Sequence, residues 1–221
     1  MATGKLIVFE GAEGAGKTTQ VKRLAERLSA VGLPCLAVRE PGGTAVGDAI
    51  RQLLLDPERE ITAATEALLF MASRAELIAR EIRPALGKGT VVLLDRFFLS
   101  TYAYQVAGRG LPEAGIRAAN KLATGGLVPD LTLLLDISAR DGLARADARG
   151  DRDRMEKSGA EFHDRVGGAF KKFTDKTWQA SHPECGPITL LDGAGDETEI
   201  FGQVTRALTK AFPKLFSGLA S

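Results

Sequence analysis

The chain has 221 residues, with 29 basic and 28 acidic side chains. This length predicts one domain over residues 1–221, and the balanced charge does not favour nucleic acid or a membrane surface as a partner. The two cysteines are too few for a disulfide framework or a metal cluster. Because the sequence shows neither a charged leader before an apolar segment nor an apolar run of about 20 residues, we expect a cytoplasmic protein without a membrane span.

The first pattern along the chain is an apolar strand that runs into a glycine-rich loop. Residues 6–9 read Leu-Ile-Val-Phe, and Gly11–Thr18 fits G-x-x-x-x-G-K-[ST], the pattern of a phosphate-binding loop. Its glycines allow backbone N–H groups to close around a phosphate, while Lys17 supplies a charge and the Thr18 hydroxyl can ligate Mg²⁺. The loop predicts binding of a nucleoside triphosphate, and it does not identify the phosphate acceptor.

Strands and helices alternate along the rest of the chain, which predicts a parallel α/β sheet. The expected strands are 6–9, 35–38, 90–94, 131–135 and 188–191. The expected helices are 21–31, 46–55, 62–86, 99–106, 112–124, 139–148, 160–180 and 197–212. The predicted fold class is therefore α/β, with a five-stranded parallel sheet flanked by helices.

Two of the expected strands lead into an aspartate, Asp95 and Asp136. Ligands of such sheets bind at the carboxyl ends of the strands, so both carboxylates are candidates for the metal side of the site. Asp95 is followed by Arg96, which a phosphate site would use, whereas Asp136 precedes a helix start, where capping is a common role. We favour Asp95, together with Thr18, as the Mg²⁺ ligands.

Two of the expected helices carry polar and aromatic side chains at helical spacing. Phe70 and Arg74 are four residues apart and share one face, which would suit stacking and hydrogen bonding to a base. From spacing alone, a core phenylalanine beside a solvated arginine is the better interpretation, because aromatic residues on helices are usually buried. Thr101, Tyr104 and Gln105 share a face of another helix, close to the carboxyl edge of the sheet.

The segment 140–157 is rich in both signs of charge. Arg145, Arg149 and Arg152 are spaced so that three guanidinium groups would lie on one helical face. Charge runs are usually solvated surface, but phosphoryl transfer needs cations over the transferring group, and mobile lids exclude water from such reactions. Because a phosphate-binding loop is present, we favour a short arginine-rich lid at approximately residues 145–157.

Several segments together resemble the bacterial thymidylate kinase family. Beyond the phosphate-binding loop, the resemblance is carried by Arg39–Thr44, Leu69–Arg74, Asp95–Phe97, Ser100–Gln105, Pro129–Asp136 and Phe162–Val166. The loop alone is shared by many kinases, whereas the combination is specific and covers nearly the whole chain. The resemblance implies a P-loop kinase fold, transfer of the γ-phosphate of ATP to dTMP to give ADP and dTDP, Mg²⁺ as the cofactor, and a homodimer.

The resemblance also implies which residues hold the nucleotides. Those implied to bind ATP are Gly11, Ala12, Glu13, Gly14, Ala15, Gly16, Lys17, Thr18 and Thr19. Those implied to bind dTMP are Glu13, Arg51, Phe70, Arg74, Arg96, Thr101, Tyr104 and Gln105. In such enzymes Arg96, assisted by Arg51, would clamp the dTMP phosphate, and Glu13 would lie near the sugar 3′-hydroxyl. Tyr104 would lie beneath the deoxyribose.

The same resemblance implies how the base is read. Phe70 would stack on thymine and Arg74 would donate a hydrogen bond to a base oxygen. Thr101 and Gln105 would meet the base edge. The chain departs from the family pattern at Phe170, where a tyrosine is usual, and at Phe97, where a tyrosine or histidine is frequent.

The variable positions of the phosphate-binding loop, 12–15, contain no basic residue. Some family members carry one there, so this chain resembles the members that supply the cation from the lid. Arg149 is then the leading candidate, followed by Arg152, Arg145 and Arg154. The residues expected to act on the transferring phosphoryl group are Lys17, Arg96, Arg149 and Arg152.

Two other functions stay open at this stage. The chain would also suit a kinase for another nucleoside monophosphate or for a deoxynucleoside. A third hypothesis is a regulatory protein that binds nucleotide and switches a partner. A switch GTPase should carry an N-K-x-D signature, which is absent from the sequence. The site motifs favour the dTMP kinase over both.

Overall fold

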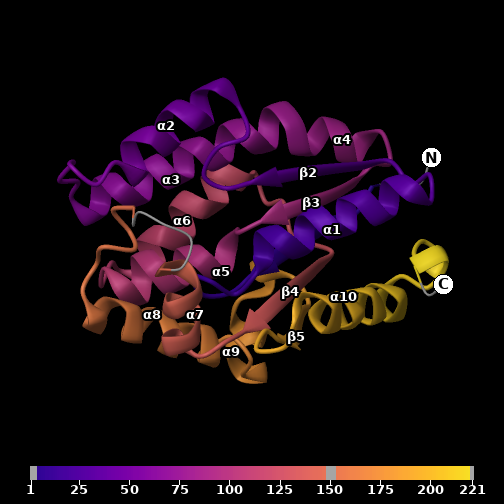
Figure 1. Ribbon diagram of the computed structural model, residues 1–221. Helices are drawn as coiled ribbons and strands as arrows, with labels where there is room; N and C mark the ends of the chain where they lie inside the picture. Colours follow the sequence, from indigo (N-terminus) through magenta and orange to yellow (C-terminus); the bar gives the residue numbers. More distant parts are fainter. Residues whose placement is uncertain (1–3, 148–152, 220–221) are drawn as a thin grey trace.

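The structure is a computed structural model that describes residues 4–147 and 153–219 (Figure 1). Within these residues five parallel strands form one sheet in the order β2-β3-β1-β4-β5. The strands are β1 (Leu6–Glu10), β2 (Cys35–Arg39), β3 (Val91–Asp95), β4 (Leu131–Asp136) and β5 (Ile188–Asp192). The prediction of a five-stranded parallel α/β sheet is therefore confirmed.

Helices connect the strands and cover both faces of the sheet (Figure 1). The α-helices are α1 (Lys17–Ala30), α2 (Ala45–Leu55), α3 (Ala63–Leu77), α4 (Arg83–Gly87), α5 (Phe98–Thr101), α6 (Glu113–Thr124), α7 (Ala139–Asp147), α8 (Ala160–Lys172), α9 (Lys176–Ser181) and α10 (Glu197–Ala211). Two π-helical segments, η1 (Ile78–Ile82) and η2 (Tyr102–Gly108), continue α3 and α5. No helix in the described part of the chain is both long enough and apolar enough to cross a membrane.

The central strand β1 is buried on both faces, and its side chains divide between two cores. Leu6 and Val8 pack in the core that includes residues of α5, η1, η2 and α8. Ile7 and Phe9 pack in the core that includes residues of α1 and α10. Burial on both faces is typical of parallel sheets, and it explains why this strand is a continuous apolar run in the sequence. Each such side chain contributes about 1.5–3 kcal/mol when it is fully buried.

The long helix expected over 62–86 is present as a continuous helical run, with a wider π turn between α3 and α4. This turn lies just before Pro84, which has no backbone N–H to donate and therefore cannot continue the regular ladder. The helix expected over 99–106 likewise becomes π-helical after its first turn. The run of α5 and η2 places its polar face beside the carboxyl end of β3.

The single helix expected over 160–180 is wrong, because the structure contains two helices there, α8 and α9. Asp175 caps the second helix, and its side chain accepts a hydrogen bond from the Trp178 backbone N–H at 2.8 Å. The break lets the Trp178 ring lie 4.4 Å from the Phe173 ring and stack on His182 at 3.8 Å between centroids. Aspartate is a favoured N-cap residue, so Asp175 is a signal in the sequence for a helix that starts at Lys176.

Candidate active site

The predicted site residues converge on one cavity of about 350 Å³ at the carboxyl edge of the sheet. Those that line it are Glu13, Gly14, Gly16, Lys17, Thr18, Thr19, Arg51, Phe70, Arg74, Asp95, Arg96, Thr101, Tyr104 and Gln105. Gly11, Ala12 and Ala15 belong to the same loop as the first of these residues without lining the cavity. Residues that are far apart in the sequence therefore meet where ligands of parallel sheets bind.

The phosphate-binding loop connects β1 directly to α1. Gly14 has a φ of 70°, and a Cβ there would lie 2.0 Å from the Gly142 carbonyl oxygen, so both its conformation and its surroundings require glycine. Gly16 also has a positive φ, of 86°, and directly precedes the first residue of α1. Helix α1 therefore directs its unpaired N–H groups and the positive end of its dipole toward the loop, which favours an anion there.

Lys17 is buried and curls back over the loop. Its Nζ donates hydrogen bonds to the carbonyl oxygens of Gly11 at 3.0 Å and Ala12 at 2.7 Å. Burial, together with the neighbouring charge of Arg96, lowers the pKa of Lys17 to about 8, although the carboxylates of Glu13, Asp95 and Glu10 act in the opposite direction. A phosphate beside this amine would favour its charged form and draw Nζ away from the two carbonyls.

Thr18 and Asp95 form the pair expected to bind a metal. Thr18 Oγ1 donates a hydrogen bond to Asp95 Oδ2 at 2.5 Å, and Asp95 is buried at the end of β3. Asp136, the competing candidate, is exposed at the end of β4 and does not line the cavity. A hydroxyl and a carboxylate oxygen side by side are hard oxygen donors, so this pair fits Mg²⁺.

Arg96 follows β3 in a left-handed conformation, with a φ of 71°. Such a conformation costs a non-glycine residue about 1–3 kcal/mol. Its NH2 donates to Glu13 Oε2 at 2.6 Å, its NH1 donates to Ser100 Oγ at 3.1 Å, and its guanidinium lies over the Tyr104 ring. Arg96 is thereby held across the cavity, between the phosphate-binding loop and α5.

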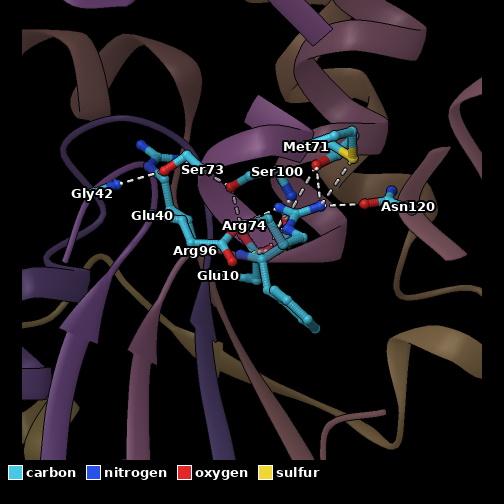
Figure 2. A network of polar contacts seen from close by, with 11 residues as sticks. Glu10, Glu40, Gly42, Met71, Ser73, Arg74, Arg96, Ser100 and Asn120 are labelled. Atoms are coloured by element: carbon cyan, nitrogen blue, oxygen red, sulfur yellow. Dashed lines mark hydrogen bonds and ion pairs between the residues drawn. The ribbon is translucent and has the colours of Figure 1, made fainter. Parts of the chain in front are cut away.

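The turn that carries Arg96 is fixed by Glu10, a residue without a predicted role in the site. Glu10 is fully buried at the end of β1. Its carboxylate accepts hydrogen bonds from the Phe97 N–H at 2.7 Å, the Ser100 N–H at 3.0 Å and the Ser100 hydroxyl at 2.6 Å (Figure 2). These bonds offset the strain at Arg96 by tying its flanking residues to the sheet.

Phe70 and Arg74 lie on α3 and both line the cavity. Phe70 is half-buried, so one part of its ring is accessible from the cavity. Arg74 is only 2% exposed. The interpretation from spacing alone, a core phenylalanine beside a solvated arginine, is therefore wrong for the arginine.

All five N–H groups of the Arg74 guanidinium have acceptors within the protein (Figure 2). The acceptors are Glu40 Oε2, at 2.7 Å from Nε and 2.6 Å from NH2, the Phe97 carbonyl and Thr101 Oγ1, each at 3.0 Å, and Asn120 Oδ1. A hydrogen bond from Arg74 to a ligand would therefore share or replace one of these. Within the described residues, the other oxygen of Glu40 and the amide nitrogen of Asn120 are buried without a partner.

Four buried polar residues in and behind the wall of the cavity were not predicted from the sequence: Glu10, Glu40, Glu66 and Asn120. Glu40 lies in the Arg39–Thr44 segment and lines the cavity, and burial raises its pKa despite the charge of Arg74. Glu66 lies in the first turn of α3, where an acidic residue is expected simply to complement the helix dipole. The sequence therefore gives little sign that these carboxyl groups support the site.

Two of the four lid candidates, Arg149 and Arg152, lie outside the described residues. Arg145 donates to the carbonyl oxygens of Gly193 and Ala194, each at 2.9 Å. Arg154 is mostly buried, donates to the Leu54 carbonyl at 2.7 Å, and pairs with Glu66 Oε2 at 2.8 Å. Asp153, Met155 and Glu156 line the cavity, so the end of the expected lid segment reaches the site.

The remaining predicted residues are also placed by clear contacts. Arg51 NH1 donates to the Pro41 carbonyl at 3.0 Å, and burial lowers the pKa of this arginine. Phe97 is fully buried, with its ring against Phe98 and beneath the Arg74 guanidinium. Phe170 is buried, with its ring centroid 6.4 Å from that of Tyr104. Both departures from the family pattern therefore act through packing.

A phosphate-binding loop at the carboxyl edge of this parallel sheet, opening into one cavity with a half-buried aromatic ring, defines a P-loop kinase fold. The family model for thymidylate kinase matches residues 9–182. The chain belongs to the thymidylate kinase family.

Individual relatives agree with this assignment. A thymidylate kinase of Pseudomonas fluorescens is 53% identical over 169 residues, which cover 76% of this chain and 80% of the relative. The thymidylate kinase of Deinococcus radiodurans is 43% identical over 210 residues, covering 95% and 98% of the two chains. That of Carboxydothermus hydrogenoformans is 46% identical over 202 residues, covering 91% and 95%.

Proposed function

We propose that this protein is an ATP-dependent kinase that transfers the γ-phosphate of ATP to dTMP, producing ADP and dTDP. The observation that carries the proposal is a single cavity lined both by the phosphate-binding loop and by Phe70, Thr101 and Gln105. The loop suits a triphosphate, and an aromatic ring with two hydrogen-bonding side chains suits a base. The names of the curated relatives support the same reaction.

The donor side of the reaction rests on the loop and on α1. The loop N–H groups and Lys17 would hold the ATP phosphates and offset their charge. Mg²⁺ would be held by Thr18 and Asp95, and when bound it neutralises charge on the phosphoryl oxygens. Three or more His, Cys, Asp or Glu side chains do not cluster as metal ligands in the described residues, so the remaining ligands would be phosphate oxygens and water.

The acceptor side rests on Arg96 and α3. Arg96, with Arg51, would hold the dTMP phosphate, while Glu13 and Tyr104 would contact its sugar. Phe70 would stack on the base, an arrangement that aromatic rings favour. The attacking phosphate oxygen is largely deprotonated at neutral pH, so the reaction needs no general base. Catalysis is then positioning and charge neutralisation.

Arginine side chains of the lid would complete the charge around the transferring group. Positions 12–15 of the loop offer no cation, and Arg145 and Arg154 already bind other parts of the protein. These contacts leave Arg149 and Arg152 as the candidates for this role. An arginine that reaches the transferring group stabilises the charge of the transition state, which is the role proposed for one of these two residues.

The decisive experiment measures ADP release with ATP, Mg²⁺ and a panel of nucleoside monophosphates and deoxynucleosides. We expect dTMP to be the preferred acceptor, because a pocket of hydrogen-bonding groups discriminates strongly against bases that leave those groups unpaired. Faster turnover of CMP, AMP, GMP or a deoxynucleoside at equal concentration would overturn the dTMP assignment in favour of the alternative kinases.

We also propose that two copies of the chain associate. Leu68 on α3 and Leu122 on α6 are 64% and 87% exposed, and α3 packs against α6. Exposed apolar side chains on neighbouring helices suit an interface with a second copy. A single domain over residues 1–221 and a cytoplasmic location stay predictions from the sequence.

A further inference from the structure

Behind the cavity, a buried carboxylate contacts one of the side chains proposed to read the base. Glu66 is fully buried in the first turn of α3. Its Oε1 accepts hydrogen bonds from Gln105 Nε2 at 3.0 Å and Arg109 Nε at 3.1 Å. Its Oε2 accepts from Arg109 NH2 at 3.0 Å and pairs with Arg154 NH2 at 2.8 Å. Two arginines and one amide therefore hold this carboxylate in a single orientation.

These contacts keep Glu66 ionised. Burial alone would raise its pKa, but the hydrogen bonds from Arg109, Gln105 and Arg154 lower the pKa below its ordinary value. An ionised carboxylate accepts hydrogen bonds and donates none. Whatever faces Glu66 must consequently be a donor.

This requirement determines the orientation of the Gln105 amide. The amide must turn its NH2 group toward Glu66, because its carbonyl oxygen would meet a carboxylate oxygen in the opposite orientation. Gln105 is 2% exposed and lines the cavity. In the described part of the chain its Oε1 has no hydrogen-bond donor and is not among the buried unpaired atoms. The carbonyl oxygen is therefore the group that the amide offers to a ligand.

We propose that Glu66 is a specificity-determining positioning residue that makes the cavity select pyrimidines with a hydrogen on ring nitrogen N3. It does so through Gln105, whose carbonyl can accept from the N3–H of thymine or uracil but not from cytosine, whose N3 carries no hydrogen. A reversed amide would present N–H and would pair with cytosine instead. The inference rests on the proposed function and adds the means by which the base is chosen.

Thr101 lies one helical turn before Gln105 and supplies a hydrogen-bond donor beside the Gln105 acceptor. Arg74 NH1 donates to Thr101 Oγ1 at 3.0 Å, so the hydroxyl proton is left to point elsewhere. Its internal acceptor, the Phe97 carbonyl, is at a long 3.4 Å, so a ligand oxygen can compete for this proton. The cavity thus offers a donor and an acceptor together, which matches the O4 and N3–H edge of thymine. Cytosine presents an amino group and a bare nitrogen along the same edge.

The test compares kcat/KM for dTMP, dUMP and dCMP in the wild-type protein and in Glu66→Gln. The new amide can donate as well as accept, so it no longer dictates the orientation of Gln105. We expect the dTMP-to-dCMP ratio to fall by about tenfold or more, the scale on which an unpaired polar group is rejected. The dTMP-to-dUMP ratio should stay unchanged, because the two bases share this edge and differ only in a methyl group.

Two further variants separate positioning from general loosening. Arg117→Met removes an ion pair with Glu184 away from the cavity and leaves Glu66 with all its partners, so it should lower the melting temperature without changing either ratio. In a Gln105→Ala background, Glu66→Gln should have no additional effect on the dTMP-to-dCMP ratio. If Glu66→Gln does not fold, Glu66→Asp retains the charge but withdraws the oxygen from Gln105, and the same fall is expected.

An unchanged dTMP-to-dCMP ratio in a folded Glu66 variant would overturn the inference, as would equal losses for all three substrates. In both cases the proposed function would stand, provided that the wild-type protein prefers dTMP. A wild-type protein that prefers dCMP would instead overturn the proposed function itself.

Discussion

Lys17 is a buried amine whose pKa is lowered by burial. This unfavourable environment indicates that the residue serves a bound anion rather than the stability of the fold. The side chain is surrounded by the loop carbonyls of Gly11 and Ala12 and by the guanidinium of Arg96. An amine that served only stability would gain more from a carboxylate partner at the surface. An anion arriving between Lys17 and Arg96 would relieve both the desolvation and the repulsion.

The first prediction at this scale concerns turnover. We expect Lys17→Ala to remain folded and to lose kcat by roughly two to three orders of magnitude, because a charge directed at the transferring phosphate is removed. Circular dichroism with thermal melting checks the fold, and ADP release checks the rate. A folded variant with near-normal kcat would remove Lys17 from the mechanism.

The second prediction follows from the lowered pKa of Lys17, about 8 in the free protein. Above this pH the free amine is mostly neutral, whereas bound phosphate favours its charged form, so ATP binding should take up a proton. The number of protons taken up on ATP binding should therefore be positive, and it should increase as the pH rises from 7 to 9. Calorimetric titration of ATP in two buffers of different ionisation enthalpy measures it.

The matched control is Lys17→Arg, which places a permanently charged group at the same position. This variant should bind ATP in that pH range without proton uptake. Equal uptake in both proteins would assign the proton to another group.

At the scale of elements, α3 supplies one wall of the site by regular spacing. Glu66, Phe70 and Arg74 are each four residues apart and so share one face of the helix. This pattern is visible in the sequence for Phe70 and Arg74. The partners that give the wall its function are not visible, because Glu40 and Asn120 reach Arg74 across 34 and 46 residues of chain.

The difference between local patterns and long-range contacts also explains which other parts of the site could be predicted from the sequence. The phosphate-binding loop and Asp95 depend on local patterns, a strand followed by glycines and a strand that ends in a carboxylate, and both were found. The buried Glu10 depends on β1 and α5 meeting in space, which no local pattern records. Helix α9 was missed because the apolar spacing continued through a break that the Asp175 cap enforces.

The next prediction concerns Arg149, the leading candidate of the proposed lid. We expect Arg149→Ala to lower kcat by roughly two to four orders of magnitude, the range that stabilising arginines contribute in phosphoryl transfer. Arg149→Lys should recover only part of the rate, because lysine keeps the charge but loses the two-pronged donor. Binding of dTMP alone, measured calorimetrically, should change little, since Arg96 and Phe70 are retained.

Arg152→Ala, Arg145→Ala and Arg154→Ala complete the comparison. Loss of rate only at Arg152 would transfer the role to that residue. Arg154→Ala should lower stability as well, because it leaves Glu66 with one arginine fewer. Normal turnover in all four alanine variants would mean that the arginines of this segment do not act on the transferring phosphoryl group.

At the scale of the whole molecule, the sheet places the proposed binding sites of both substrates at one edge. Helices on its outside carry exposed apolar side chains. The edge is fixed by β1 and β3, which bring the phosphate-binding loop beside Arg96. The outer surface includes the exposed leucines of α3 and α6. Burying a leucine contributes about 1.5–3 kcal/mol, so a second copy that covers Leu68 and Leu122 would be stabilised by both.

We therefore expect sedimentation equilibrium to give twice the chain mass for the wild-type protein and the chain mass for Leu68→Glu. A glutamate buried in an apolar interface would lose its hydration without gaining a partner. The matched control is Leu190→Glu, at a 49% exposed leucine on β5, the strand at the other edge of the sheet from β2. The control should leave the mass unchanged. A wild-type monomer would contradict the dimer, and a dimeric Leu68→Glu would place the interface on another surface.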